Sequence, residues 1–263
     1  MSLLTPAAIV IGAVIIAGAI VFVWDDDNDE PDDAATIPGE STPGSTDEEF
    51  PPGDSPATML AALQSYADDV DIDVNEFEQC LGDEQLGAPI SQHLQQGQEL
   101  GVTGTPTFFI NDKKLVGAQP FPILEEIVER ELEGPPDSVE DYSEPIQELA
   151  ATDPPNFEIT GETIDVSGAE IEGNPDAEVM IAEFSDFQCP FCQRWARESL
   201  GPVRDMVGDD VALAFMHYPL TQIHPNAGFA SFAAICAGEQ DRFWEMHDLL
   251  FERQQEWADL PPN

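Results

Sequence analysis

The sequence has little positive charge. Only 8 lysine and arginine residues stand against 53 aspartate and glutamate residues, and the formal net charge at pH 7 is −45. Such a surface repels the phosphates of nucleic acids and of anionic lipid headgroups, which argues against both as partners. Abundant carboxylates with almost no lysine resemble proteins that work in concentrated salt, where about 1 M ions shorten the Debye length to ~3 Å. We therefore expect halophilic character; the alternative is an acidic mesophilic protein.

Cysteine is also scarce, and its spacing restricts the chemistry. The chain has 4 cysteines, of which Cys189 and Cys192 are separated by two residues, whereas Cys80 and Cys236 stand alone. Structural zinc needs four ligands and usually a second pair at short spacing, so we expect no metal site. An even number of cysteines is consistent with an oxidising compartment.

The segment from Ala7 to Trp24 contains no charged residue. As a helix it would span roughly 27 Å at ~1.5 Å per residue, close to the hydrocarbon thickness of a bilayer. Neither a basic region nor a small-x-small cleavage site accompanies it, as a signal peptide would require. We expect residues 1–24 to be an uncleaved single-pass anchor in the cell membrane, with a cleaved signal peptide as the alternative. The acidic remainder favours an N-terminus inside the cell and the rest outside.

Residues 25–55 are dominated by proline, glycine, serine and carboxylates and offer almost nothing to bury. This composition predicts a disordered, self-repelling linker.

The segment 174–263 has the pattern of a strand, a helix and a second strand. The runs EVMIAEF and VALAFM are nearly continuously apolar, which is typical of strands buried on both faces. Residues Pro190 to Met206 lie between them with helical spacing, so a right-handed parallel crossover is expected. Two further helical stretches follow from Asn226 to Gln255.

The segment 56–133 has a different order. Helical stretches through MLAALQSYA, VNEFEQCL and ISQHLQQGQEL precede two short strands, TPTFFI and KLVG, around a hairpin signal at Asn111-Asp112. The stretch PFPILEEIVEREL predicts a closing helix. Residues 134–173, rich in proline and acid, are expected to be a connecting linker, with a short helix conceivable at Glu144 to Ala150. Neither half forms a complete sheet, and exposed sheet edges favour aggregation, so the two halves should pair.

These segments resemble a known family. EFSDFQCPFCQRW, HYPL, IHPNA and CAGEQDRFWEMHDLLFERQ resemble the first part of a DsbA-like thioredoxin domain, and GVTGTPTFFINDKKLVGAQPF resembles the last part. The resemblance covers roughly Ala57 to Glu133 and Asn174 to Leu260. It implies an α/β thioredoxin-like fold with an inserted helical subdomain. The half with the cysteine pair comes second here and first in the family, so the chain resembles a circular permutant.

Permutation is tolerated when the joined ends lie close together. The new connection of about 40 residues can span over ~100 Å when extended at ~3.3 Å per residue, so reach is no obstacle. We expect the halves to close within one chain, as a monomer; the alternative is a swapped dimer.

The chemistry is expected at Cys189 and Cys192, where a buried strand meets the start of a helix. The positive end of the helix dipole favours the thiolate of the first cysteine. Cys189 is thus the predicted exposed nucleophile and Cys192 its more buried partner, exchanging disulfides with substrate thiols through a mixed disulfide. Arg194 and Arg197 favour the thiolate, whereas Glu183 and Asp186 oppose it. No cofactor is expected, and the alternative is an inert structural disulfide.

The resemblance implies a cis peptide bond between Thr105 and Pro106, beside the sulfurs. Its backbone edge would pair with an extended substrate, so Thr105, Pro106, Pro190 and Phe191 are the predicted substrate-binding residues. The alternative is a trans proline that begins an edge strand. Phe191 stands where strongly oxidising relatives have histidine, which implies a weaker oxidant.

Glu183 lies inside an apolar strand, where a carboxylate is costly unless neutralised or solvated. The resemblance implies that this position handles the proton of the inner cysteine, so Glu183 is a predicted catalytic residue with a raised pKa that accepts the proton of Cys192. The alternative is a residue at the strand end that reaches water.

The resemblance also implies a structural disulfide between Cys80 and Cys236, which would tie the two halves together; two buried free thiols are the alternative. His217, His224 and His247 match family positions where packing and loop hydrogen bonding suffice, and none is expected to be catalytic.

The predicted function is a protein disulfide oxidoreductase that oxidises extracytoplasmic protein thiols and is recharged by a membrane quinone-linked partner. A reductase or isomerase would use the same residues at a lower potential. A third hypothesis is a peptide-binding holdase that uses the surface around Pro106.

Overall fold

The structure, a computed structural model, describes residues 57–261. The predicted membrane anchor at 1–24 and the predicted linker at 25–55 lie outside these residues. Within the described part, no helix is both long enough and apolar enough to cross a membrane.

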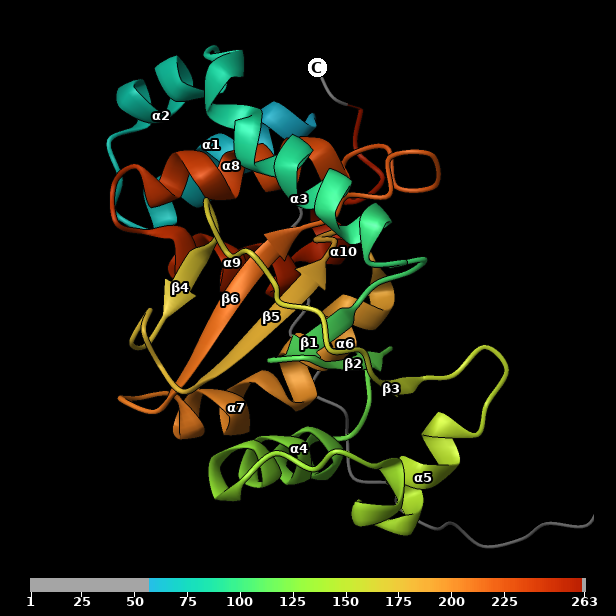
Figure 1. Cartoon of the computed structure of the whole chain (residues 1–263). Coiled ribbons are helices and arrows are strands. Elements are labelled where there is room, and N and C mark those ends of the chain that lie inside the picture. The colour runs from blue at the N-terminus through green and yellow to red at the C-terminus, as the bar shows by residue number, and fades with distance from the viewer. Residues whose placement is uncertain (1–56, 262–263) are drawn as a thin grey trace, which may run out of the picture. The chain divides into compact units, whose positions relative to one another are not determined.

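A mixed six-stranded sheet forms the centre of the described region, with the strand order β3-β2-β1-β5-β6-β4 (Figure 1). The pair β5 and β6 is parallel, and the other neighbouring pairs are antiparallel. The strands are β1 (Thr107–Ile110), β2 (Lys113–Val116), β3 (Phe157–Ile159), β4 (Glu170–Glu172), β5 (Val179–Ser185) and β6 (Val211–His217).

Helices cover both faces of the sheet, and Figure 1 shows α1, α2, α3 and α8 gathered at one end of β5 and β6, with α4, α5 and α7 toward the other. The helices are α1 (Met59–Asp69), α2 (Val74–Leu81), η1 (Glu84–Gly87), α3 (Ala88–Glu99), α4 (Phe121–Glu133), η2 (Val139–Asp141), α5 (Glu144–Ala150), α6 (Pro190–Glu198), α7 (Leu200–Met206), α8 (Ala227–Gly238), α9 (Phe243–Glu252) and α10 (Gln254–Trp257). The mixed α/β class expected from the sequence is confirmed.

The two halves of the chain meet at the pair of β1 and β5. Thr107 lies opposite Phe184 and Ile110 opposite Ile181, so the hairpin of the earlier half continues the sheet of the later half. The ends of the two halves also touch, since the backbone N–H of Met59 donates to the carbonyl of Pro261 at 2.8 Å.

Apolar side chains alternate between the two faces of these strands, as strand geometry requires. Phe108 and Ile181 face one core together with Trp195, whereas Phe109 and Phe184 face the other. Helix α3 approaches this second face closely at Gly97, where an added Cβ would lie 2.5 Å from the ring of Tyr218.

Residues 134–173 are more than the connecting linker that the sequence predicts. The segment contains α5 at the residues where a short helix was conceivable, and it supplies both edge strands of the sheet. Strand β3 pairs with β2, and β4 pairs with β6. Each edge strand is three residues long, too short for its alternation to distinguish it from a loop, which is why the sequence predicted four strands and the structure has six.

The helix expected from Pro190 to Met206 is interrupted at Ser199, between α6 and α7. Pro202 has no backbone N–H to donate to the carbonyl of Glu198, and its ring would clash with that carbonyl in a continuous helix. The break lets Leu200 and Val203 turn into the core beneath β5 and β6.

Cys80 of α2 and Cys236 of α8 form a disulfide with a Cα–Cα distance of 5.7 Å. The bond closes a loop with a sequence separation of 156 residues and links the two halves of the chain.

We predict that the double substitution Cys80→Ala and Cys236→Ala lowers the free energy of unfolding by about 3–5 kcal/mol, because the cross-link restricts the unfolded chain more when its loop is long. Denaturant unfolding of the variant and of the oxidised parent measures the difference. The control is the parent protein in which Cys189 and Cys192 are reduced and the Cys80–Cys236 disulfide is intact. An unchanged denaturant midpoint in the double variant would contradict the prediction.

Candidate functional site

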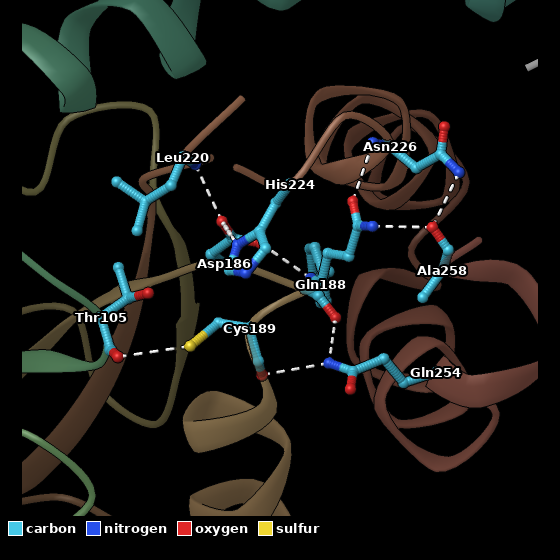
Figure 2. Close-up of polar contacts among 10 residues, drawn as sticks. Thr105, Asp186, Gln188, Cys189, Leu220, His224, Asn226, Gln254 and Ala258 are labelled. Atoms are coloured by element: carbon cyan, nitrogen blue, oxygen red, sulfur yellow. Dashed lines mark hydrogen bonds and ion pairs between the residues drawn. The ribbon is translucent and has the colours of Figure 1, made fainter. Parts of the chain in front are cut away.

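Cys189 and Cys192 lie at the start of α6, directly after the loop that follows β5. Cys189 occupies the N-cap position of the helix, and Pro190 is its first residue. Both sulfurs are free thiols. The Cys189 thiol donates to the backbone carbonyl of Thr105 at 3.4 Å, which brings the cysteine pair of one half against the proline loop of the other (Figure 2).

Cys189 is less exposed than the sequence predicted. Only 4% of its surface is accessible, and Cys192 is fully buried. The reason is tertiary, since Thr105 covers the Cys189 sulfur from the other half of the chain. The exposed group at the motif is instead Phe191, at 56%, next to the exposed Pro190. The accessible side chains of the motif are therefore Pro190 and Phe191.

The two cysteines differ in acidity. The hydrogen bond from the Cys192 thiol lowers the pKa of Cys189 to about 6, helped by the backbone N–H groups of Phe191 and Cys192 at the helix start. Burial raises the pKa of Cys192 well above its usual value. Cys189 is thus the more acidic thiol of the pair, and its assignment as the nucleophile stays a prediction.

Glu183 is buried on β5, with 1% of its surface accessible. Burial raises its pKa from 4.5 to about 8. Its Oε1 atom has no hydrogen-bond partner among the described residues. The nearby Glu183 carboxylate also raises the pKa of Cys192, so the two groups share one electrostatic environment. Glu183 does not reach water at the strand end.

The Thr105-Pro106 peptide bond is cis. Thr105 and Pro106 are both buried, and the carbonyl of Pro106 accepts from the N–H of Gly117 at 2.8 Å. The backbone edge proposed for substrate pairing is therefore partly occupied, because the Thr105 carbonyl already accepts from Cys189.

Arg194, two residues after Cys192, contacts groups other than the sulfurs. The Arg194 guanidinium lies 5.5 Å from the centre of the Phe191 ring and donates to the carbonyl of Ala118 at 3.3 Å. The Arg194 guanidinium thus packs against the exposed ring of Phe191.

A buried amide network, which sequence reasoning missed, fixes the backbone around Cys189. The Gln254 side chain donates to the carbonyls of Phe187 at 2.7 Å and Cys189 at 3.0 Å. The Gln188 side chain donates to Ala258 at 2.7 Å and accepts from the N–H of Asn226 at 2.8 Å (Figure 2). The only available signal was polar residues at positions that helical spacing assigns to the core.

Asp186 and His224 form a second contact that the sequence analysis missed. Asp186 is fully buried, and its Oδ2 lies 2.8 Å from Nδ1 of His224. His217 and His247 are buried elsewhere in the core, where burial lowers their pKa values. Among the described residues no cluster of histidine, cysteine or carboxylate side chains is suited to hold a metal ion.

Comparison with known proteins gives two family matches, one on each half of the chain. A DSBA-like thioredoxin domain matches residues 54–129, and a thioredoxin family matches residues 167–262. A probable disulfide bond formation protein D of Bacillus anthracis is 33% identical over 91 residues, which cover 32% of this chain and 42% of that protein.

Other relatives carry a different name. A protein of Mycolicibacterium gilvum called Na(+)/H(+) antiporter NhaA 1 is 40% identical over 99 residues, or 37% of this chain and 16% of the relative. An NhaA 3 antiporter of Salinispora tropica is 38% identical over 95 residues, 14% of its length. This chain thus spans about a sixth of the antiporters' length, and the similarity is that of a shared segment. The matches to both halves support a relation to the DSBA-like thioredoxin domain family.

Proposed function

We propose that the protein oxidises thiols of extracytoplasmic proteins through a dithiol–disulfide cycle at Cys189 and Cys192. The observation that carries the proposal is the unequal pair at the start of α6, in which the pKa of Cys189 is lowered to about 6 while that of Cys192 is raised. A stabilised Cys189 thiolate favours the reduced form, and a disulfide whose reduced form is stabilised is a better oxidant.

The cycle conserves electrons. A substrate thiolate attacks Cys189 of the disulfide, and the Cys192 sulfur leaves as a thiolate. A second substrate thiolate then attacks the substrate sulfur of the mixed disulfide, which frees Cys189. The substrate has lost two electrons and the cysteine pair has gained them. Because the proposed oxidant must be regenerated, we also propose a membrane quinone-linked partner that accepts these electrons.

Glu183 is proposed to exchange the proton of Cys192 during this cycle. It is a buried carboxyl group on the strand that leads into the motif, and its negative charge raises the pKa of Cys192. A group with a pKa of about 8 both takes and returns a proton near neutral pH.

The chain is also proposed to be a circular permutant that closes on itself as a monomer. Supporting this, the two family matches lie on separate halves, β1 pairs with β5 inside one chain, and Met59 contacts Pro261 where the unpermuted order would be continuous. Light scattering that shows only an obligate dimer would contradict closure within the chain.

The first test of the proposed function is the reduction potential of Cys189–Cys192, measured by equilibration with glutathione in high salt. A value near or above about −180 mV is expected for a donor of disulfides, whereas a value near about −270 mV would replace the oxidase with a reductase. Cys192→Ser should accumulate the mixed disulfide at Cys189, and Cys189→Ser should lose exchange altogether. Full peptide binding by Cys189→Ser, without exchange in the parent protein, would favour the holdase.

Substitution of Glu183 by glutamine should flatten the pH dependence of exchange. In the parent, the rate of the step limited by Cys192 deprotonation is expected to rise as Glu183 ionises, up to about pH 8. Stopped-flow reduction between pH 6 and pH 9 measures the profile, with Glu172→Gln on the edge strand as the control. An unchanged profile would remove the proton role.

The same substitution should change stability in a defined direction. The folded-state pKa of Glu183 lies above 4.5, so the folded protein holds this proton more tightly than the unfolded chain. That contribution is complete at pH below 4.5 and is lost as the pH rises toward 8. Urea unfolding in this interval should therefore show a smaller loss of stability with pH in Glu183→Gln.

We further propose a halophilic protein anchored in the cell membrane by residues 1–24, with the described region outside the cytoplasm. The composition supports salt dependence, since a net charge of −45 destabilises the compact state unless ions screen it. The melting temperature should rise steeply from low to molar salt, and a melt that does not depend on salt would contradict halophilic character. Fractionation of expressing cells, followed by carbonate washing, tests the anchor.

A further inference from the structure

Asp186 is a buried carboxylate that the exchange cycle does not use. It stands three residues before Cys189, and none of its side-chain surface is accessible. A carboxylate in such a place is costly unless donors surround it. Its position next to the redox pair indicates a role there.

The donors around Asp186 come from three places. One carboxylate oxygen accepts from the N–H of Gln188 at 2.7 Å, and the other accepts from the N–H of Leu220 at 2.8 Å and contacts Nδ1 of His224 at 2.8 Å. Figure 2 shows these contacts converging on the carboxylate beside Cys189. In addition, the backbone carbonyl of Asp186 accepts from the N–H of Cys189 at 3.0 Å.

These contacts connect the nucleophile to the loop that follows β6. The side chain of Asp186 holds Leu220 and His224, while its backbone and its contact with Gln188 hold the residues that lead into Cys189. His224 keeps 16% of its side chain accessible, whereas Asp186 has none. His224 therefore lies between the buried anion and solvent.

We propose that Asp186 is a positioning residue that tunes the stability of the Cys189 thiolate, and that its contact with His224 moderates this effect. The carboxylate fixes the loop but opposes the neighbouring thiolate by charge repulsion, and the hydrogen bond with His224 disperses part of that negative charge. The proposal rests on the proposed function for its biological meaning. It would make the redox potential depend on a residue that never touches the substrate.

The other titratable groups that act on Cys189 lie on different elements. Cys192 is on α6, and Glu183 on β5 interacts with Cys189 electrostatically. Both remain unchanged in the test, so its readout isolates the Asp186–His224 pair.

The test compares Asp186→Asn with His224→Phe, both in the full chain. Asparagine keeps an oxygen acceptor for one of the two loop N–H groups and removes the negative charge, so the pKa of Cys189 should fall by about one unit. Phenylalanine keeps a ring but removes the hydrogen bond to the carboxylate, so the pKa of Cys189 should rise, by about half that amount. Thiolate absorbance against pH measures both shifts, because the pKa of Cys189 lies well below that of Cys192 and the two thiols titrate separately.

The glutathione equilibrium should move with the thiolate. Asp186→Asn is expected to make the disulfide more oxidising by about tenfold in the equilibrium constant, which is about 30 mV for a two-electron couple, and His224→Phe less oxidising. Asp248→Asn is the matched control, because Asp248 also contacts a histidine ring, His247, at 2.8 Å but lies on α9. It should leave Cys189 unaffected.

Opposite shifts in the two variants support the proposal, since a loss of structure alone would move both in one direction. Shifts of the same sign, or shifts no larger than that of Asp248→Asn, would overturn it. If Asp186→Asn does not fold, the sign of the pKa shift in His224→Phe decides: a fall or no change overturns the proposal. The titration needs no enzymatic turnover, so it remains decisive even if the parent protein fails to exchange disulfides.

Discussion

The structure depends on one antiparallel pairing, between β1 and β5. Neither half of the chain can bury its strands alone, because each contributes an unpaired edge with strong hydrogen-bonding groups. When Thr107 lies opposite Phe184 and Ile110 opposite Ile181, the hairpin and the parallel pair become one sheet. The same pairing places the Thr105 carbonyl 3.4 Å from the Cys189 sulfur, so the proposed redox site is complete only once the halves are joined.

Charge around the redox site is arranged by burial more than by the residues nearest in sequence. Arg194 is two positions after Cys192, yet its guanidinium contacts the Phe191 ring and the Ala118 carbonyl, and no contact with a sulfur is found among the described residues. The Cys189 thiolate is instead stabilised by Cys192 and by N–H groups at the start of α6. Glu183 and Asp186, two buried carboxyl groups on one short stretch, have different surroundings. Glu183 Oε1 has no partner among the described residues, whereas Asp186 accepts from two backbone N–H groups and contacts Nδ1 of His224.

The protein has a net charge of −45, and some of its few basic side chains form ion pairs between secondary-structure elements. Lys113 is buried in β2 and lies 3.0 Å from Glu131 of α4, and Arg204 of α7 joins Glu172 at 2.8 Å and Asp248 at 2.7 Å. These pairs connect the sheet to the helices that cover it. Salt screens partly buried ion pairs less than exposed charges. In high salt these pairs therefore keep much of their attraction, while the repulsion between surface carboxylates is reduced.

The sequence by itself determined the α/β class, the positions of β5, β6 and the hairpin, and the cysteine pair at a helix start. It also identified Glu183 as a carboxyl group inside an apolar strand. Each of these follows from periodicity or from local spacing, which are properties of neighbouring residues. The family resemblance supplied Thr105-Pro106 and the pairing of Cys80 with Cys236, neither of which spacing implies. Only the tertiary structure decided that residues 134–173 close both sheet edges, that Cys189 is covered, and that Asp186 meets His224. The physical reason is the same in each case: a three-residue strand, a buried sulfur and a side-chain contact across a loop are fixed by partners distant in the chain. No local sequence pattern specifies which partner will be there.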